Sequence, residues 1–266
     1  MGKEKKNQRK LFGKNVGIFA TCLVDIVRPS VGFASVKLIE MSGCNVSAPR
    51  LQSCCGQPAY NSGDYDSSIS IAREVVKVFI DFDYIVVPSG SCCGMIKKHY
   101  PELLKDDQYW GNKAKELSSK TYELTVFLSE IFNFEPKVSS NWENIPVTYH
   151  DSCSGLRELG IKGQPRSLLK KIKGLKLTEG AEAETCCGFG GLFCMKYPDI
   201  AEKMVDMKVE DILRTNAKMV LGGDLGCLLN ISGRLTRLGK NIEVRHIAEV
   251  LADMMEPSAI GFSEEE

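Results

Sequence analysis

A doubled cysteine pair, present twice, constrains this chain more than any other feature. Cys54-Cys55-Gly56 in the first half recurs as Cys186-Cys187-Gly188 in the second half. Each pair has one cysteine upstream and one downstream at a matching distance. The positions that correspond between the halves are Cys22 and Cys153, Cys54 and Cys186, Cys55 and Cys187, and Cys92 and Cys227, with offsets of 131, 132, 132 and 135 residues. Four cysteines that recur in register over half a chain indicate an internal repeat of one site.

The pattern around the cysteines predicts an α/β fold of two pseudo-repeated halves. Short apolar runs such as 16–20, 84–88 and 219–221 alternate with helical periods, as in 65–82 and 198–214. This alternation is typical of parallel strands joined by helices. The predicted organisation is a basic tail (1–14), a first repeat with a connecting helix over 113–134 (15–135), a linker (136–146), a second repeat (147–256) and an acidic tail (257–266). After the strand at 84–88 we expect a cysteine turn and a helix from Met95.

Parallel sheets form their sites outside the carboxyl ends of the strands. The outer cysteines of both sets, Cys22, Cys92, Cys153 and Cys227, come shortly after predicted strands. Each set of four cysteines is therefore expected to converge on one rim of its sheet.

Composition and the N-terminus favour a cytoplasmic protein with reduced thiols. The eleven cysteines are an odd number, and adjacent cysteines bridge each other only with strained geometry, so a disulfide framework is disfavoured. The apolar run 16–24 follows six basic residues and resembles a secretory signal. However, the run contains Cys22, whose counterpart Cys153 lies deep in the chain, so we interpret the run as a buried strand. No apolar stretch reaches the roughly 20 residues of a membrane span.

The charge balance excludes one class of partner. Lys plus Arg and Asp plus Glu number 34 each, which gives a formal net charge of zero. A neutral chain is not expected to bind nucleic acid or membrane surfaces through general electrostatic attraction.

Four thiolates around one centre suit either Zn²⁺ or an iron–sulfur cluster. Structural zinc usually takes its cysteines in pairs two to four residues apart, whereas here three ligand positions are separated by more than 30 residues. A cluster contains several irons, so adjacent cysteines can ligate different irons. We therefore predict iron–sulfur centres, with zinc as the alternative. The predicted ligands are Cys22, Cys54, Cys55 and Cys92 for one centre and Cys153, Cys186, Cys187 and Cys227 for the other.

The remaining cysteines and the histidines are interpreted as non-ligands. Cys44 lies in a predicted strand, where a buried thiol commonly behaves as a small hydrophobic group, and Cys93 and Cys194 have no counterpart in the other half. His99, His150 and His246 show no metal-binding spacing with one another, although His150, three residues before Cys153, is placed to hydrogen-bond near a cluster. No nucleotide or flavin fingerprint is found, so a partner or a cofactor without a sequence fingerprint must handle any two-electron step.

The two Cys-Cys-Gly repeats resemble the cysteine-rich CCG domain of the iron–sulfur oxidoreductases. This family includes the CCG-containing component of heterodisulfide reductase and the iron–sulfur subunits of glycolate oxidase and anaerobic glycerol-3-phosphate dehydrogenase. The resemblance runs from about Val16 to Met255 and is strongest to the members that act in lactate utilization. The stretches that carry it are 51–63, Thr185 to Gly191 and 227–234.

The resemblance implies an electron-transfer subunit of a multi-protein system that oxidises L-lactate to pyruvate. Its cofactors are implied to be iron–sulfur clusters, of 4Fe-4S type, and its partners two companion lactate-utilization proteins, an iron–sulfur subunit and an accessory subunit. The family pattern has a further cysteine three residues before the last one, where this chain has Ser89 and Asp224. These two side chains are therefore candidate oxygen ligands, and the cluster type stays open. A disulfide-reducing catalytic subunit and a zinc-held, non-enzymatic assembly module are the alternatives.

Overall fold

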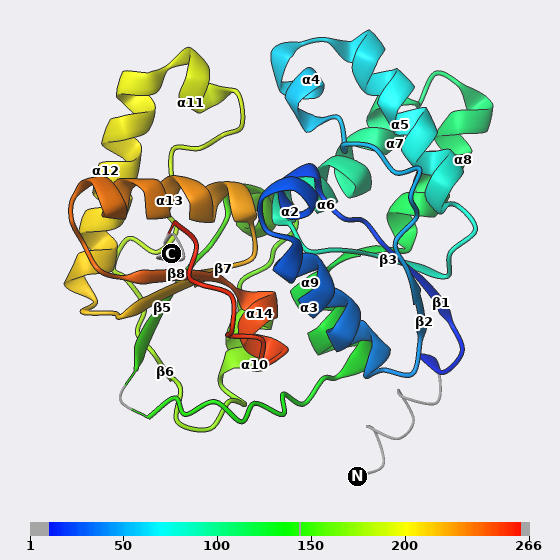
Figure 1. Cartoon of the computed structure of the whole chain (residues 1–266). Helices are drawn as coiled ribbons and strands as arrows, with labels where there is room; N and C mark the ends of the chain where they lie inside the picture. Colours follow the sequence, from blue (N-terminus) through cyan, green and yellow to red (C-terminus); the bar gives the residue numbers. More distant parts are fainter. Residues whose placement is uncertain (1–10, 144, 262–266) are drawn as a thin grey trace. The chain divides into compact units, whose positions relative to one another are not determined.

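The computed structural model describes residues 11–143 and 145–261, and the chain divides into two compact units between Phe134 and Glu135 (Figure 1). Within the described residues, each unit contains one four-stranded sheet in which all strands are parallel. The strand order is β2 (Asn45–Ser47), β1 (Asn15–Ile18), β3 (Tyr84–Val87), β4 (Thr121–Glu123) in the first unit and β6 (Lys176–Leu177), β5 (Pro146–His150), β7 (Met219–Gly222), β8 (Glu243–His246) in the second. The predicted fold of two pseudo-repeated α/β halves is thus confirmed.

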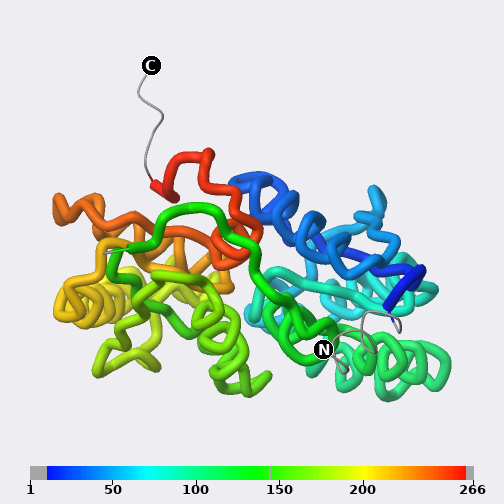
Figure 2. The backbone as a smooth tube through the Cα atoms, turned by 90° about the horizontal axis from the view of Figure 1, so that it is seen from below, coloured from blue at the N-terminus to red at the C-terminus, as the bar shows by residue number. Residues whose placement is uncertain are grey.

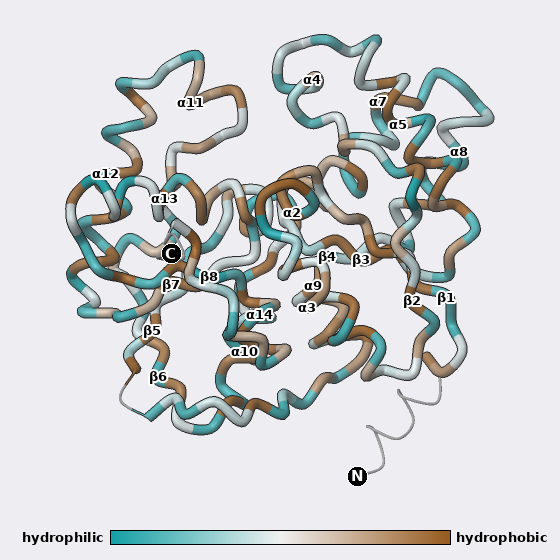
Figure 3. The backbone as a smooth tube through the Cα atoms, in the orientation of Figure 1, coloured by the Kyte–Doolittle hydropathy of each residue, from teal (hydrophilic) through white to brown (hydrophobic). Residues whose placement is uncertain are grey.

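The central strands form the cores of the two units. Ile85, Val86 and Val87 of β3 are at most 1% exposed, and Val220 and Leu221 of β7 are fully buried. Strands that are covered on both faces read as continuous hydrophobic runs, which is what these segments show. In Figure 3 the hydrophobic colouring follows β3, while hydrophilic residues mark the outer loops.

Helices cover both faces of each sheet. In the first unit, α3 (Pro29–Glu40) joins β1 to β2, α5 (Tyr65–Phe79) joins β2 to β3, and α8 (Gln108–Ser119) joins β3 to β4. Because the chain reverses its direction along the sheet after β2, right-handed crossovers place α3 on one face and α5 with α8 on the other. In agreement with this, α5 packs against α8.

The second unit repeats this arrangement. Its crossover helices are α10 (Gly163–Leu169), α12 (Pro198–Arg214) and α13 (Leu225–Arg237). α12 packs against α13, and α10 packs against α14 (Ile247–Leu251). The shorter helical segments of the chain are α2 (Cys22–Val27), α4 (Gln57–Ser62), α6 (Gly90–Gly94), η1 (Met95–His99), α7 (Tyr100–Leu103), α9 (Leu124–Val126), η2 (Phe127–Phe132), η3 (Ser154–Glu158) and α11 (Phe193–Lys196).

Both strand orders contain one switch point. In the first unit the chain leaves β1 toward β2 on one side and then crosses to β3 on the other side, so the connections after β1 and β3 diverge. The same divergence occurs between β5 and β7 in the second unit. A crevice at the carboxyl ends of two such strands is where ligands bind in open α/β sheets.

The connecting region differs from the prediction. The single helix expected over Lys113–Phe134 is wrong, because Thr121–Glu123 forms strand β4 and splits the region into α8, α9 and η2. Tertiary context overrides helical periodicity here: Thr121, Tyr122 and Glu123 pair in register with Ile85, Val86 and Val87.

The cysteine loops and the tails also differ from the prediction. The helix expected from Met95 begins at Gly90, so that Cys92 is helical, and α13 begins before Cys227. In the tails, Leu11 and Ile260 are 1% and 3% exposed, which shows that core packing reaches into both predicted tails. Residues 1–10 and 262–266 of these tails lie outside the described residues.

The predicted linker is fastened to the second unit. Residues 133–143 form no helix or strand, and Figure 2 traces this segment in green. Its Trp142 is 2% exposed, and the hydroxyl groups of Ser139 and Ser140 donate to the Asp253 carboxylate, each at 2.5 Å.

Candidate metal centres

All four outer cysteines follow the carboxyl ends of central strands, as the sequence predicts. Cys22 begins α2 after β1, and Cys92 lies in α6 after β3. In the second unit, Cys153 immediately precedes η3 after β5, and Cys227 lies in the first turn of α13 after β7. The outer cysteines therefore flank the switch point of each sheet, where the crevice opens.

The four cysteines of the first unit lie in a chain of neighbouring thiols. The Sγ atoms of Cys22 and Cys54 are 4.0 Å apart, and those of Cys55 and Cys92 are 3.3 Å apart. A hydrogen bond between Cys54 and Cys55 links these two pairs. We call this chain of four thiols the first cysteine centre.

The second unit contains the same chain of contacts. Cys153 and Cys187 interact with Cys186 and lower the pKa of its thiol, and the Sγ atoms of Cys187 and Cys227 lie within 4.8 Å of each other. These four thiols form the second cysteine centre. In each unit the four cysteines of the repeat thus lie at the same end of the sheet, and their assignment as ligands remains a prediction.

Each centre favours one thiolate. Hydrogen bonds from Cys22 and Cys55 hold the pKa of Cys54 well below its usual range, and hydrogen bonds from Cys153 and Cys187 do the same for Cys186. The thiolate is the form of cysteine that binds metals.

Glycine is required directly after each cysteine pair. Gly56 and Gly188 both have φ of +81°, in the left-handed region that favours glycine. At Gly188 a Cβ atom would lie 2.5 Å from the backbone oxygen of Ala201, and at Gly56 it would lie 3.2 Å from Ile71 Cγ2. The recurring Cys-Cys-Gly motif therefore encodes a sharp turn that α12 approaches closely in the second unit.

The two units hold the cysteine pair by different side chains. In the first unit the hydroxyl group of Tyr100 donates to the backbone oxygen of Cys55 at 2.8 Å. In the second unit the Nδ2 atom of Asn230 donates to the backbone oxygen of Cys187, also at 2.8 Å. Both anchors fix the turn at the second cysteine of the pair, and the sequence analysis missed both.

A buried ion pair supports the end of β5. Arg166 of α10 donates to both carboxylate oxygens of Asp151 at 2.6 and 2.7 Å, and Asp151 is only 3% exposed. The guanidinium group of Arg166 also lies over the Tyr149 ring, 5.0 Å from its centroid. The pair fixes the strand end that leads into Cys153.

Two buried side chains of α12, Lys208 and Asp211, support the loop before Cys186. Lys208 of α12 is 2% exposed and donates to the backbone oxygens of Glu182 and Ala183 at 2.7 and 3.1 Å. The Asp211 carboxylate accepts from the backbone nitrogen of Glu182 at 3.0 Å. These side chains hold the loop against α12, and burial lowers the pKa of Lys208.

Ser89 and Asp224, the candidate oxygen ligands, both precede the helix that carries a cysteine. The Ser89 hydroxyl accepts from the backbone nitrogen of Cys92 at 3.3 Å, as an N-cap does. Asp224 occupies the same position before α13 and is 5% exposed. The Ser89 side chain therefore has a structural role as a helix cap, whereas the Asp224 side chain makes no capping hydrogen bond to α13.

The other cysteines have different surroundings. The Cys44 thiol accepts from the Ser42 hydroxyl at 3.0 Å and donates to the backbone oxygen of Leu11 at 3.3 Å. Cys93 is fully buried, and burial raises the pKa of its thiol. Cys194 donates to the backbone oxygen of Gly191 at 3.2 Å.

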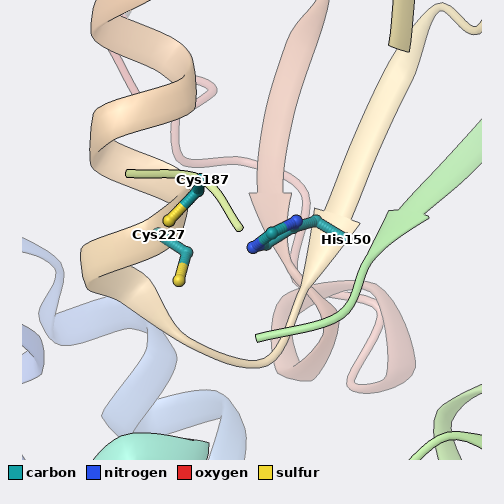
Figure 4. A group of neighbouring side chains, drawn as sticks. All are labelled: His150, Cys187 and Cys227. Atoms are coloured by element: carbon teal, nitrogen blue, oxygen red, sulfur yellow. The ribbon is translucent and has the colours of Figure 1, made fainter. Parts of the chain in front are cut away.

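His150 lies at the second centre, whereas the other two histidines have separate roles. His99 contacts the Tyr60 ring at 4.7 Å between centroids, and His246 caps α14. His150 ends β5 and places a ring nitrogen within 4.8 Å of the Sγ atoms of Cys187 and Cys227 (Figure 4). Burial lowers the pKa of His150 to about 3, so its ring is neutral. The sequence offered one sign of this location, because His150 lies at the end of a predicted strand and three residues before Cys153.

The first centre adjoins a pocket. A pocket of about 330 Å³ is lined by Cys22 and Cys54 together with polar side chains that include Asp25, Arg50 and Gln52. Cys22 itself is exposed, whereas its counterpart Cys153 is only partly exposed. The first centre is therefore accessible from this pocket at Cys22 and Cys54.

The donor sets fit a thiolate-ligated centre. Four neighbouring thiols, one favoured as a thiolate, are the donors that both zinc and iron–sulfur clusters take. The buried imidazole of His150 adds a donor that zinc and iron also accept. Among the described residues, no helix has both the length and the apolar character needed to cross a membrane.

Comparisons with known proteins agree with this arrangement. The cysteine-rich CCG domain matches residues 16–97 and 147–232, one match in each unit. Lactate utilization protein A of Shouchella clausii (strain KSM-K16) is 48% identical, and the protein of the same name from Bacillus subtilis (strain 168) is 46% identical. Each alignment covers 89% of this chain and 98% of the relative. A hypothetical protein from Helicobacter pylori shares the fold, with a TM-score of 0.62 and 13% identity, over 96% of this chain and 54% of that chain.

Proposed function

Because the chain belongs to the cysteine-rich CCG domain family, we propose that it is an iron–sulfur electron-transfer subunit of a multi-protein system that oxidises L-lactate to pyruvate. The observation that carries this proposal is the duplicated chain of four thiols at the switch point of each sheet. The lactate role follows from the relatives named for lactate utilization, which this chain matches over 89% of its length.

We assign the two centres to the eight cysteines of the repeat. Cys22, Cys54, Cys55 and Cys92 would hold one centre, and Cys153, Cys186, Cys187 and Cys227 the other. A bound cluster supplies one-electron redox chemistry. The chain's own residues keep the thiols together, favour the thiolate form and allow the backbone to approach the centre at Gly56 and Gly188.

The proposed system contains two companion proteins, an iron–sulfur subunit and an accessory subunit. This chain would pass electrons between them, and a partner would perform the two-electron step on lactate. All eleven cysteines are free, which suits the reducing cytoplasm that we propose as the location.

The test combines metal analysis with reconstitution. We expect anaerobically purified protein to contain iron and acid-labile sulfide equivalent to one or two clusters per chain. Lactate should bleach the visible absorption of this chain only when both companion proteins are present. Iron without lactate-dependent bleaching in the complete system would contradict the lactate role, and lactate oxidation by the chain alone would contradict the subunit role.

A zinc-held assembly module is the second candidate, and one observation favours it. Tetrahedral zinc with Zn–S bonds of about 2.3 Å separates its sulfur atoms by about 3.8 Å. Two of the six Sγ separations in the first centre, 3.3 Å for Cys55–Cys92 and 4.0 Å for Cys22–Cys54, lie on either side of this value. Stoichiometric zinc without sulfide in the anaerobic protein would establish this second function in place of electron transfer.

A further inference from the structure

The imidazole of His150 is buried without a hydrogen-bond partner. The residue is 2% exposed, and neither Nδ1 nor Nε2 has a partner among the described residues. Leaving a buried polar group unsatisfied costs about 1–3 kcal/mol. A histidine in this position therefore calls for a group that its nitrogen atoms can bind.

The surroundings of the ring indicate what that group is. The ligand atoms of His150, Cys187 and Cys227 all lie within 4.8 Å of one another, and Cys187 and Cys227 are 2% and 9% exposed. In Figure 4 the ring extends from the end of β5 toward the two thiol groups. One nitrogen and two sulfur atoms converging in a buried site form a donor set that zinc and iron accept.

The first unit has a different residue at this position. β1 pairs Val16 with Tyr84, and β5 pairs Val147 with Met219, so the sheet registers match Phe19 to His150. Phe19 is fully buried and packs against Phe79 with ring centroids 5.5 Å apart. The fold therefore tolerates an apolar ring at this strand end, and the imidazole is not needed for packing alone.

We propose that His150 is a nitrogen ligand in the second unit, where it binds the same metal atom as Cys187 and Cys227. The two centres then differ in their donors: thiolates alone in the first unit, and thiolates with one imidazole in the second. The proposal rests on the proposed function only in requiring a metal at the second centre, and it holds for iron or zinc.

Isotope labelling of histidine tests the ligand directly. In the reduced iron protein, pulsed electron paramagnetic resonance should detect a nitrogen coupling that changes when ¹⁴N-histidine is replaced by ¹⁵N-histidine. In protein that contains zinc, cobalt replaces zinc and the same coupling is measured on cobalt. Backbone amides hydrogen-bonded to sulfur keep ¹⁴N in both samples, so they do not contribute to the difference.

Substitutions assign the coupling to one residue. His150→Phe, which introduces the residue of the first unit, should abolish the isotope-dependent coupling. The His99→Gln and His246→Asn variants should retain it. A coupling that survives His150→Phe, or no isotope dependence in metal-loaded unmodified protein, would overturn the proposal.

A rescue experiment separates ligation from packing. His150→Phe should lower the metal content of the second unit, and His150→Cys should restore it, because a thiolate replaces the lost donor. Equal metal loss in both variants would indicate a packing role and contradict the proposal. If the Phe variant does not fold, isotope labelling of the unmodified chain still shows whether a histidine nitrogen binds the metal. An absence of metal in the unmodified chain would instead refute the proposed function.

Discussion

The two cysteine centres share one scaffold but have different surroundings. In the first unit, the strand end beside the centre carries the apolar ring of Phe19, and a pocket reaches the exposed Cys22. In the second unit, the same strand end carries His150 and Asp151, and the adjacent loop is held by Lys208. The comparison shows that topology places the thiols, while the residues around them have diverged. The first centre is the more open of the two at Cys22, and the second has more polar and charged side chains around it.

Removal of one ligand from each centre is expected to give the largest effect. Cys55→Ser should empty the first centre and Cys187→Ser the second, each removing about half of the metal per chain. Because metal binding is coupled to folding, each variant should also destabilise its own unit. Metal analysis and hydrogen exchange along the chain would measure both effects. Full metal retention in either variant would refute the ligand assignment for that centre.

Loss of the buried lysine should affect the second unit alone. Lys208→Met leaves the backbone oxygens of Glu182 and Ala183 without their donor and should lower the free energy of unfolding by about 2–4 kcal/mol. α5, the corresponding helix of the first unit, buries Ser68 and otherwise apolar side chains such as Val75 and Val76. Denaturant unfolding measures the effect. The matched control is Lys203→Met on the exposed face of the same helix, and equal stability of the two variants would contradict the interpretation.

The hydrogen bonds from Tyr100 and Asn230 to the cysteine-pair carbonyls should each contribute less to the free energy of unfolding than Lys208 does. Tyr100→Phe removes the hydrogen bond to Cys55 and Asn230→Ala the one to Cys187, each at about 1–2 kcal/mol. Hydrogen exchange should increase around the cysteine pair of the altered unit and remain unchanged in the other unit. Exchange that rises equally in both units would show that the two centres are not independent.

The smallest predicted effect is a pH dependence confined to the second unit. Burial raises the pKa of Asp253, but hydrogen bonds from Ser139 and Ser140 outweigh this and lower it from 3.8 to about 2. Because the folded pKa lies below the unfolded pKa, this stabilisation is complete above about pH 4 and is lost as the pH falls toward 2. Solvent screening limits it to about 1 kcal/mol.

Acid unfolding of Asp253→Asn checks this prediction. The variant should lose less stability between pH 4 and pH 2 than the unmodified chain. The unfolding free energies of the two proteins should therefore converge as the pH falls. Parallel pH profiles would show that the Asp253 carboxylate does not fasten residues 139–140 in its ionised form.

The sequence predicted the fold class and the eight clustered cysteines because both depend on local or repeated patterns. Apolar strands and amphipathic helices are recognisable within a few residues, and α12 was predicted with its observed bounds, Pro198–Arg214. The offsets of 131 to 135 residues showed which cysteines correspond. A site repeated in register can be recognised before any contact is known.

The errors lie where long-range pairing competes with local propensity. Thr121–Glu123 lies in a segment with helical periodicity but forms β4 because it pairs with β3. The helices that contain Cys92 and Cys227 were missed because each begins only a few residues after its strand. Their N-cap residues, Ser89 and Asp224, were interpreted only as candidate ligands.

The sequence by itself determined which thiols belong together, that the strands are parallel and that each set lies at strand ends. Only the tertiary structure decided what surrounds the thiols. Tyr100, Lys208 and Asn230 reach the cysteine loops from helices 25 to 45 residues away along the chain. His150 differs from an ordinary core histidine only in what its nitrogen atoms face, which depends on how β5, α13 and the loop of Cys187 pack together. Such convergence has no local signature in the sequence, because it is produced by folding.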